Sequence, residues 1–368
     1  MGALARHAGH RQVPRRRDRC AYGARRGPAL NVVDFARPLI DIDSTTGREG
    51  EAGEWIASAL RSLGYEVQEQ PVSPGRGNIV ATLDRPTVVL STHYDCVPPF
   101  FASSVEDGRL IGRGACDAKG ILSSQVAAVE RLRAEGERRV GLLFVVGEER
   151  GSDGAAVANA SPAGSQYLIN GEPTDSRLGL ATRGNLRVRL HARGKAAHSS
   201  RPEQGISAID LLIDALIRLR GLELPADPDL GTTYYTIGLI EGGVAPNVVS
   251  PHATAEVMFR TVTPPEIILE RLEALRPLVD IEEVLRVPHV RLKTWSDSPL
   301  ERAVFPFTTD IPLLDRWGMP LLFGPGSILE AHTQRESIGI DELKAAVGHY
   351  VALSQACLRE RQAGAESP

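Results

Sequence analysis

The chain has 368 residues, beyond the roughly 250 to 300 at which a single hydrophobic core stops growing, so at least two domains are expected. Its formal net charge of −4 is unevenly distributed, because residues 1–28 hold eight arginines and one aspartate and the remaining residues therefore carry −11. An acidic body argues against nucleic-acid binding, and no apolar run approaches the roughly 18 residues that a membrane-spanning helix requires.

The arginine-rich segment 1–28 differs in composition from everything that follows it. We expect this segment to be disordered or to precede the native start; an organellar transit segment and a basic arm for nucleic acid are the alternatives. The four cysteines lack the CxxC spacing of a thiolate zinc site and indicate no disulfide framework. A reducing compartment, and hence the cytoplasm, is the predicted location.

Short apolar runs alternate with helical patterns from residue 29 to 182 and again from 293 to 368. Helical spacing of apolar residues predicts helices within 46–67, 120–136 and 336–358. Runs of aliphatic and β-branched residues predict strands at 77–83, 86–91, 140–146, 166–170 and 319–324. The alternation predicts an α/β domain with a mostly parallel sheet and helices on both faces.

Residues 183–292 interrupt this alternation with a different order of elements. The patterns predict strands and helices in the order βαββαβ, at 185–192, 205–221, 232–242, 252–261, 264–278 and 281–287. That order is the ferredoxin-like, or split βαβ, arrangement. We therefore expect a second domain of about 110 residues inserted into the first.

Polar residues follow the ends of several predicted strands, which is where ligands bind in open α/β sheets. Each has an ordinary explanation: a histidine at a strand end is more often structural, paired glutamates often mark a solvated corner, and a glutamate before proline can open a turn. Together, two histidines and several carboxylates form the nitrogen and oxygen ligand set that suits zinc or another divalent ion. The residues are His93, Asp95, Asp117, Glu148, Glu149, Glu172 and His332.

The glycine-rich stretch "GRGACDAKG", residues 112–120, invites comparison with nucleotide-binding loops. A GxGxxG motif starting at Gly112 would need glycine where Asp117 stands. A phosphate-binding loop would need Ser or Thr after Lys119, and Gly120 stands there instead. Neither nucleotide motif is present.

Six motifs stand in one order along the chain: "HYDCVP", "GRGACDAKG", "GEERGS", "NGEPT", "GKAAHSSRPEQG", and "GPG" followed by "AHT". In this order and near this spacing they resemble the M20 family of di-zinc metallopeptidases. The branch that the chain resembles contains acetylornithine deacetylase and succinyl-diaminopimelate desuccinylase. The resemblance extends from about residue 31 to the C-terminal helix.

The resemblance implies a catalytic domain, residues 29–182 and 293–368, that holds two zinc ions, with cobalt or manganese as possible replacements. Asp117 would bridge the two metals, His93 and Glu172 would complete one site, and Glu149 and His332 would complete the other. It further implies that residues 183–292 form a lid that also joins two subunits into a homodimer.

Two acidic residues beside the implied ligands have separate roles by the same resemblance. Asp95 would accept a hydrogen bond from the far imidazole nitrogen of His93 and fix the ring. Glu148 would be the general base that takes the proton of the metal-bound water, leaving a metal-bridging hydroxide. Two zinc ions, three ligand carboxylates and one hydroxide sum to zero charge, which leaves Glu148 free to move protons.

Residues of the lid and of the GPG motif would contact the substrate. His198 would reach the partner subunit's active site and stabilise the oxyanion, the alternative being an ordinary surface-loop histidine. Arg260 and Asn247 match residues that bind the substrate's carboxylate and backbone polar groups, although a solvated strand-end charge is the alternative for Arg260. Gly326, with Gly324, would offer backbone N–H groups to the substrate carboxylate or simply form a turn.

The predicted function is metal-dependent hydrolysis of the amide bond of an N-acyl amino acid. Glutamate at position 172 is typical of deacylases and carboxypeptidase-like members, whereas members acting on a free amino terminus tend to have aspartate there. N-acetylornithine deacetylation, in arginine synthesis, is the first expectation; desuccinylation of succinyl-diaminopimelate and carboxypeptidase or dipeptidase action follow. An inactive homologue that only binds is the remoter alternative, because all five ligands and Glu148 are retained.

Overall fold

The computed structural model describes residues 30–365. The predictions made for residues 1–28 therefore lie outside the described part of the chain. No helix within it is long and apolar enough to cross a membrane.

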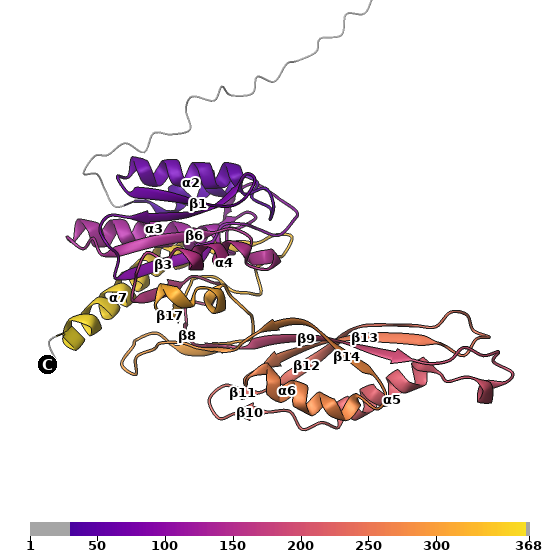
Figure 1. The fold of residues 1–368 in the computed structure, drawn as a ribbon. Coiled ribbons are helices and arrows are strands. Elements are labelled where there is room, and N and C mark those ends of the chain that lie inside the picture. Colours follow the sequence, from indigo (N-terminus) through magenta and orange to yellow (C-terminus); the bar gives the residue numbers. More distant parts are fainter. Residues whose placement is uncertain (1–29, 366–368) are drawn as a thin grey trace, which may run out of the picture.

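A six-stranded sheet, in the order β1-β2-β6-β3-β7-β17, forms the centre of the larger part of the molecule (Figure 1). Strands β6, β3, β7 and β17 run parallel, whereas β1 and β2 pair antiparallel at one side. Strands β3 and β6 are buried along their whole length, which explains their continuous apolar sequences. The strands are β1 (Glu66–Ser73), β2 (Arg76–Thr82), β3 (Val88–His93), β6 (Val140–Val145), β7 (Tyr167–Asn170) and β17 (Met319–Leu322).

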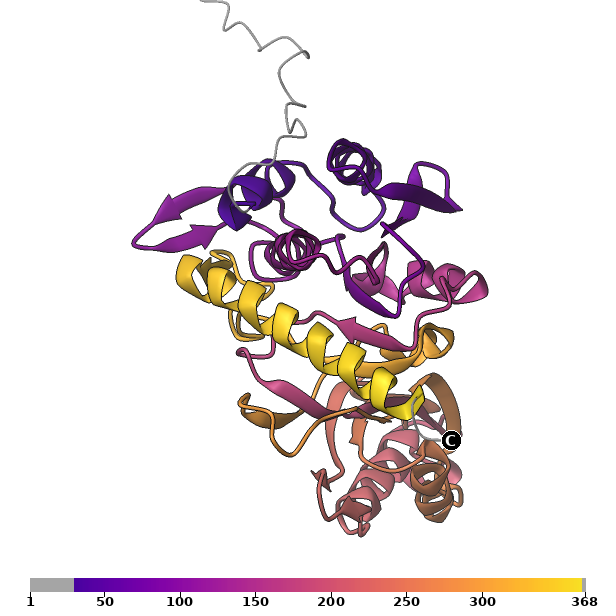
Figure 2. The same ribbon diagram turned by 90° about the vertical axis from the view of Figure 1, so that its left-hand side faces the viewer.

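Helices cover both faces of this sheet, because alternate strand residues point to opposite sides. Val88 and Leu90 belong to a core shared with α1, α2, α3 and α7, while Val89 packs with α4 and Trp317 on the other face. Helices α3 and α7 lie side by side (Figure 2). The prediction of a mostly parallel α/β fold is confirmed. The helices are α1 (Val32–Ile40), α2 (Gly50–Ser62), α3 (Lys119–Ala134), α4 (Asp153–Ala160) and α7 (Ile340–Ala365).

The middle of the chain forms a second, antiparallel sheet in the order β12-β13-β9-β14. Helices α5 and α6 pack on its side away from the larger sheet (Figure 1). In chain order the unit runs β9, α5, β12, β13, α6, β14, which is the βαββαβ order expected from the sequence. Its elements are β9 (Gly184–Arg193), α5 (Ala208–Arg220), β12 (Tyr234–Gly242), β13 (His252–Thr261), α6 (Pro265–Leu272) and β14 (Asp280–Val287).

Smaller elements connect these two parts and surround the loops of the larger sheet. A three-stranded sheet of β15 (Val290–Arg291), β8 (Leu178–Thr182) and β16 (Arg302–Phe305) lies where the chain passes between the two larger sheets. A second contains β18 (Ser337–Gly339), β5 (Arg109–Ile111) and β4 (Ser104–Glu106), and a short ribbon pairs β10 (Ala226–Asp227) with β11 (Gly231–Thr232). The 3-10 helices are η1 (Glu148–Arg150), η2 (Pro202–Gln204), η3 (Glu273–Leu275), η4 (Ile311–Leu313) and η5 (Asp315–Trp317).

Candidate metal centre

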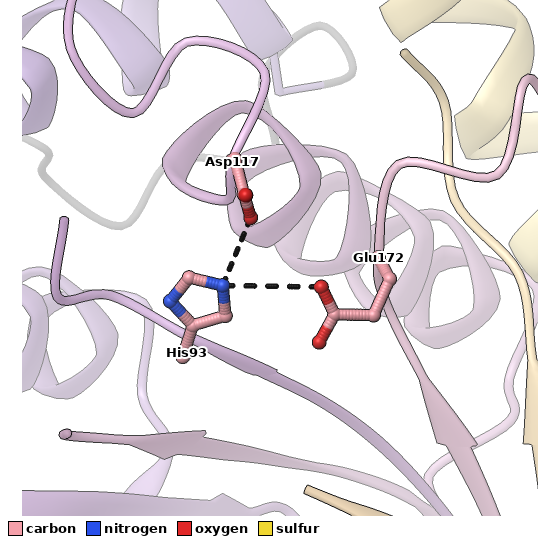
Figure 3. Close-up of side chains that lie close together, drawn as sticks. All are labelled: His93, Asp117 and Glu172. Atoms are coloured by element: carbon pink, nitrogen blue, oxygen red, sulfur yellow. Dashed lines mark hydrogen bonds and ion pairs between the residues drawn. The ribbon is translucent and has the colours of Figure 1, made fainter. Parts of the chain in front are cut away.

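His93, the last residue of β3, lies at the carboxyl edge of the parallel strands and is 1% exposed. Its Nε2 is 3.0 Å from Oδ1 of Asp117 and 3.9 Å from Oε2 of Glu172. Figure 3 shows the imidazole facing both carboxylates, which come from the turn before α3 and from the segment after β7. These three residues therefore converge from segments far apart in the sequence.

A second group of possible ligands shares Asp117 with the first. Nε2 of His332 is 3.3 Å from Oδ2 of Asp117 and 2.9 Å from Oε1 of Glu149. In each group of three, the nitrogen and oxygen atoms that could bind a metal lie within 4.8 Å of one another. The structure thus brings together all five predicted ligands, in two sets joined through the two oxygens of one aspartate.

The local chain geometry explains how these residues reach one another. Glu149 lies in η1, which follows β6, and Glu172 comes two residues after β7. Both strands are neighbours of β3, so their carboxyl ends share one edge of the sheet. His332 comes from the loop after β17 and adopts φ +63°, a left-handed conformation that is uncommon for a residue other than glycine.

The electrostatics of the site indicate an excess of buried negative charge. Burial, followed by the charge of Glu148, raises the pKa of Glu172 well above its ordinary value. Although burial lowers the pKa of His93, hydrogen bonds to Asp117 and Asp95 raise it well above the ordinary value. Hydrogen bonds to Asp117 and Glu149 raise the pKa of His332 to about 10. In each case the site favours added positive charge, which bound cations would supply.

The donor atoms fit a pair of divalent ions of the zinc, cobalt or manganese type. Three carboxylates and two imidazoles are the oxygen and nitrogen ligands that such ions accept. Oε1 of Glu172 is buried and finds no hydrogen-bond partner among the described residues. A buried carboxylate oxygen without a partner is costly, and a metal ion would satisfy it.

The carboxylate of Asp95 fits only in part its predicted role of accepting a hydrogen bond from His93. Its carboxylate accepts hydrogen bonds from the N–H groups of Glu148 at 3.1 Å and Glu149 at 3.2 Å, and from Oγ1 of Thr46 at 2.8 Å. Nδ1 of His93 is 3.0 Å from the backbone carbonyl of Asp95 but 3.4 Å from its carboxylate. The carbonyl is therefore the nearer partner of the ring, and the carboxylate mainly holds the turn that carries the two glutamates.

Glu148 begins η1, next to Glu149, but belongs to neither group of three possible ligands. Burial raises the pKa of Glu148 well above its ordinary value, and the charges of Asp310, Asp117 and Glu149 add to the increase against the opposing effect of His93. A carboxylate in these surroundings holds a proton more readily than one in water. This property suits a group that must accept and then return a proton.

The structure does not bring His198 and Asn247 to the two metal-ligand groups of the same chain. They lie in adjacent loops, since the N–H group of Ser199 donates to the carbonyl of Asn247 at 2.9 Å. His198 follows β9, whose ten residues span roughly 30 Å from the end next to β8 to the far end of the second sheet (Figure 1). His198 is exposed, with Nδ1 2.9 Å from Oγ of Ser200.

Arg260 lies away from the two metal-ligand groups, whereas Gly326 packs beside Asp117, since a Cβ atom on it would lie 2.6 Å from Sγ of Cys116. Arg260 pairs with Asn185 near the start of β9, the end of the second sheet closest to the larger one. It lies on the sheet face opposite Phe259, which packs with the helices. The N–H group of Gly326 donates to Oε1 of Glu342 at 2.7 Å, which favours the turn over the contact with substrate. The N–H group of Gly324 is likewise engaged, by Oγ1 of Thr174 at 2.9 Å.

A buried aspartate and a buried ion pair near the site were not predicted from the sequence. Asp310 is 1% exposed, and burial raises the pKa of its carboxyl group to about 6. Glu336 and Arg113 form an ion pair of 2.6 Å beside Asp117. The only available signal for Glu336 was its position four residues after His332.

Comparison with known proteins gives a consistent result. A model of the family described as Peptidase family M20/M25/M40 matches residues 89–356. A peptidase M20 domain-containing protein of Schizosaccharomyces pombe is 37% identical over 334 residues, which cover 85% of this chain and 81% of the relative. A probable carboxypeptidase of Aspergillus clavatus is 34% identical, over 91% of this chain and 84% of the relative. The crystal structure of the aminopeptidase PepT from Bacillus cereus superposes with a TM-score of 0.76 at 23% identity, over 89% of this chain and 98% of PepT.

Proposed function

The chain belongs to peptidase family M20/M25/M40, whose members are hydrolases, and we propose that it is a two-metal carboxypeptidase-type enzyme that cleaves the amide bond next to a free α-carboxylate. The observation that carries this proposal is the pair of three-residue groups joined through Asp117. One chemical class then covers both peptides and N-acyl amino acids, because each presents an acyl group, a scissile amide and a carboxylate.

The five convergent side chains would hold the metals in two sets. His93, Asp117 and Glu172 would bind one ion, and Asp117, Glu149 and His332 the other. Zinc is the proposed metal, with cobalt or manganese as replacements that accept the same donors. When bound, such a pair acidifies a water molecule and polarises the scissile carbonyl.

Glu148 is the proposed proton carrier. Its carboxylate would take the proton from the attacking water and return it to the leaving amine nitrogen. The raised pKa of Glu148 favours holding that proton between the two steps. The hydrogen bond from its own N–H group to Asp95 fixes the start of η1 and therefore the position of the side chain.

Three features favour a carboxypeptidase or deacylase over an aminopeptidase. Glu172 stands where family members that act on a free amino terminus tend to have aspartate. The Aspergillus relative is named a probable carboxypeptidase, and Arg260 offers a guanidinium that can bind a carboxylate through two hydrogen bonds. N-acetylornithine deacetylation, a role in arginine synthesis and a cytoplasmic location stay predictions.

A homodimer formed through the predicted lid, residues 183–292, would complete the site. His198 and Asn247 lie at the far end of β9, so a second copy could bring them to this chain's metal groups. The lid also has apolar side chains for such contact: Ile240 on β12 is 61% exposed and Ile217 on α5 is 60% exposed. β12 is an edge strand of its sheet among the described residues, and an unpaired strand edge accepts a second strand.

Four matched substrates, with a peptide that has a free amino terminus for comparison, test the proposed reaction. A dipeptide with a blocked amino terminus and a free carboxylate should be hydrolysed, as should an N-acetyl amino acid, and chelation should abolish both activities. Amidating the C-terminus should remove most of the turnover, and Arg260→Lys should raise KM more than it lowers kcat. Hydrolysis only of peptides with a free amino terminus, whatever the state of the carboxylate, would overturn the carboxypeptidase proposal. N-acetyl-L-ornithine, as the fourth substrate, tests the narrower prediction.

A further inference from the structure

Glu336 and Arg113 form a buried ion pair that takes no part in the proposed reaction. Glu336 is fully buried and Arg113 is 1% exposed. Nη1 of Arg113 donates to Oε2 of Glu336 at 2.6 Å. Burying two charges is costly unless their hydrogen-bonding capacity is used, so the other contacts of the pair indicate what it does.

The second oxygen of Glu336 holds the backbone of the turn that carries Asp117. Oε1 accepts the N–H groups of Gly114 at 3.0 Å, Cys116 at 2.9 Å and Asp117 at 2.9 Å. Three N–H groups of one turn, directed at one oxygen, form an anion-binding concavity. The turn is closely packed, because a Cβ atom at Gly114 (φ +90°) would lie 2.8 Å from Sγ of Cys96.

Arg113 extends the same connection to the loop that carries His332. Its Nη2 donates to the carbonyl of Thr333, the residue after His332, at 3.0 Å. The N–H group of Gly112 also donates to the carbonyl of Glu336 at 3.0 Å. Together these bonds join the turn 112–117 to the loop 332–336, and thus the shared aspartate to one of the two histidines.

From these contacts we infer that the Arg113–Glu336 pair is a positioning device for the metal centre, which fixes the separation of Asp117 and His332. This inference rests on the proposed function, since it takes those residues as ligands. His332 supports it, because its left-handed backbone persists only where surrounding contacts hold it. Two apolar side chains of the same size as Arg113 and Glu336 could fill the same space. They could not accept hydrogen bonds from the three N–H groups.

Two variants separate the positioning role from simple filling of space. Glu336→Gln alone keeps a carbonyl oxygen for the three N–H groups and leaves Arg113 bonded to the Thr333 carbonyl. Arg113→Met with Glu336→Leu has nearly the same volume and no acceptor. Arg335→Gln, which breaks the neighbouring exposed ion pair with Glu106, is the control on the same loop.

The readouts are zinc affinity, by competition with a chromophoric chelator, and the visible spectrum of the cobalt-loaded protein. We expect the Gln variant to stay close to the wild type and the Leu variant to bind metal 10- to 100-fold more weakly, the usual effect of losing a contact behind the ligands. The cobalt spectrum of the Leu variant should change, and that of Arg335→Gln should not. Equal affinities and spectra for the Gln and Leu variants would overturn the inference.

Hydrogen exchange in the wild-type protein provides a test that needs neither variant nor metal. In the chelated protein, the amides of Gly114, Cys116 and Asp117 should exchange slowly, because each donates to Glu336. Rapid exchange of these three amides would contradict the inference even if the variants fail to fold. If they are protected but the protein binds no metal, the proposed function fails while the contact itself stands.

Discussion

Replacing Glu172 with glutamine should change the stability of the metal-free and metal-loaded proteins in opposite directions. Glu172 is 5% exposed, its Oε1 has no hydrogen-bond partner among the described residues, and burial with the charge of Glu148 raises its pKa. Keeping an unpaired carboxylate charged in such a buried place costs roughly 1–3 kcal/mol. Removing the charge while keeping the shape should return about that amount to the metal-free protein. For a chain of this length, the melting temperature should rise by about 1–4 °C.

With metal bound, the sign should reverse, because glutamine supplies a weaker ligand than carboxylate. Residues behind a ligand already account for 10–100-fold in metal affinity, so loss of the ligand carboxylate itself should cost roughly 1,000-fold or more, about 4.1 kcal/mol, which exceeds the gain in the metal-free protein. That loss lowers the stabilisation that saturating zinc provides. Calorimetric melting of chelated and zinc-loaded samples measures both effects. Replacement of the exposed Glu54 with glutamine is the control, and it should change neither melting temperature. Shifts of the same sign in the two samples would refute the reasoning.

Three further predictions concern the proton carrier, the lid histidine and the pH dependence of stability. Glu148→Gln should retain both metals yet lose 10²- to 10⁴-fold in kcat, the usual contribution of a general base; retention of a tenth of the wild-type rate would remove Glu148 from that role. His198→Ala should lower kcat far more than metal content, and mixing it with Glu148→Gln should restore part of the activity; an unchanged mixture would argue against action across the dimer. Because Glu148 and Glu172 have folded-state pKa values above the ordinary 4.5, their contribution to the stability of the metal-free protein is greatest below pH 4.5 and declines as pH rises. The melting-temperature gap between loaded and chelated protein should therefore widen from pH 5 to pH 8, and a constant gap would contradict that sign.

The alternation of elements and the positions of His93, Glu149 and Glu172 were predictable from the sequence for a simple physical reason, whereas Asp117 and His332 were assigned as ligands by the family resemblance. Buried parallel strands require continuous apolar runs, and polar residues directly after such runs must meet at one edge of the sheet. β3 ends at His93, β6 is followed by Glu148 and Glu149, and β7 by Glu172. The convergence of these residues follows from the topology alone.

Other features depend on contacts that leave no periodic signal. β1 reads "EVQEQPVS" and is mostly exposed, so its sequence lacks the apolar run that marked the other strands. The role of the Asp95 carboxylate depends on which of two acceptors, the Asp95 carbonyl at 3.0 Å or its carboxylate at 3.4 Å, lies closer to Nδ1 of His93. Glu336 reaches Asp117 across 219 residues, and its backbone-directed hydrogen bonds give no pattern in the sequence around either residue.

Anomalous diffraction from crystals of the zinc-loaded enzyme tests the central claim most directly. The account predicts two zinc peaks, one among His93, Asp117 and Glu172 and the other among Asp117, Glu149 and His332, with one oxygen of Asp117 on each ion. A single peak, or peaks bound by residues outside these two groups, would contradict the shared two-metal site.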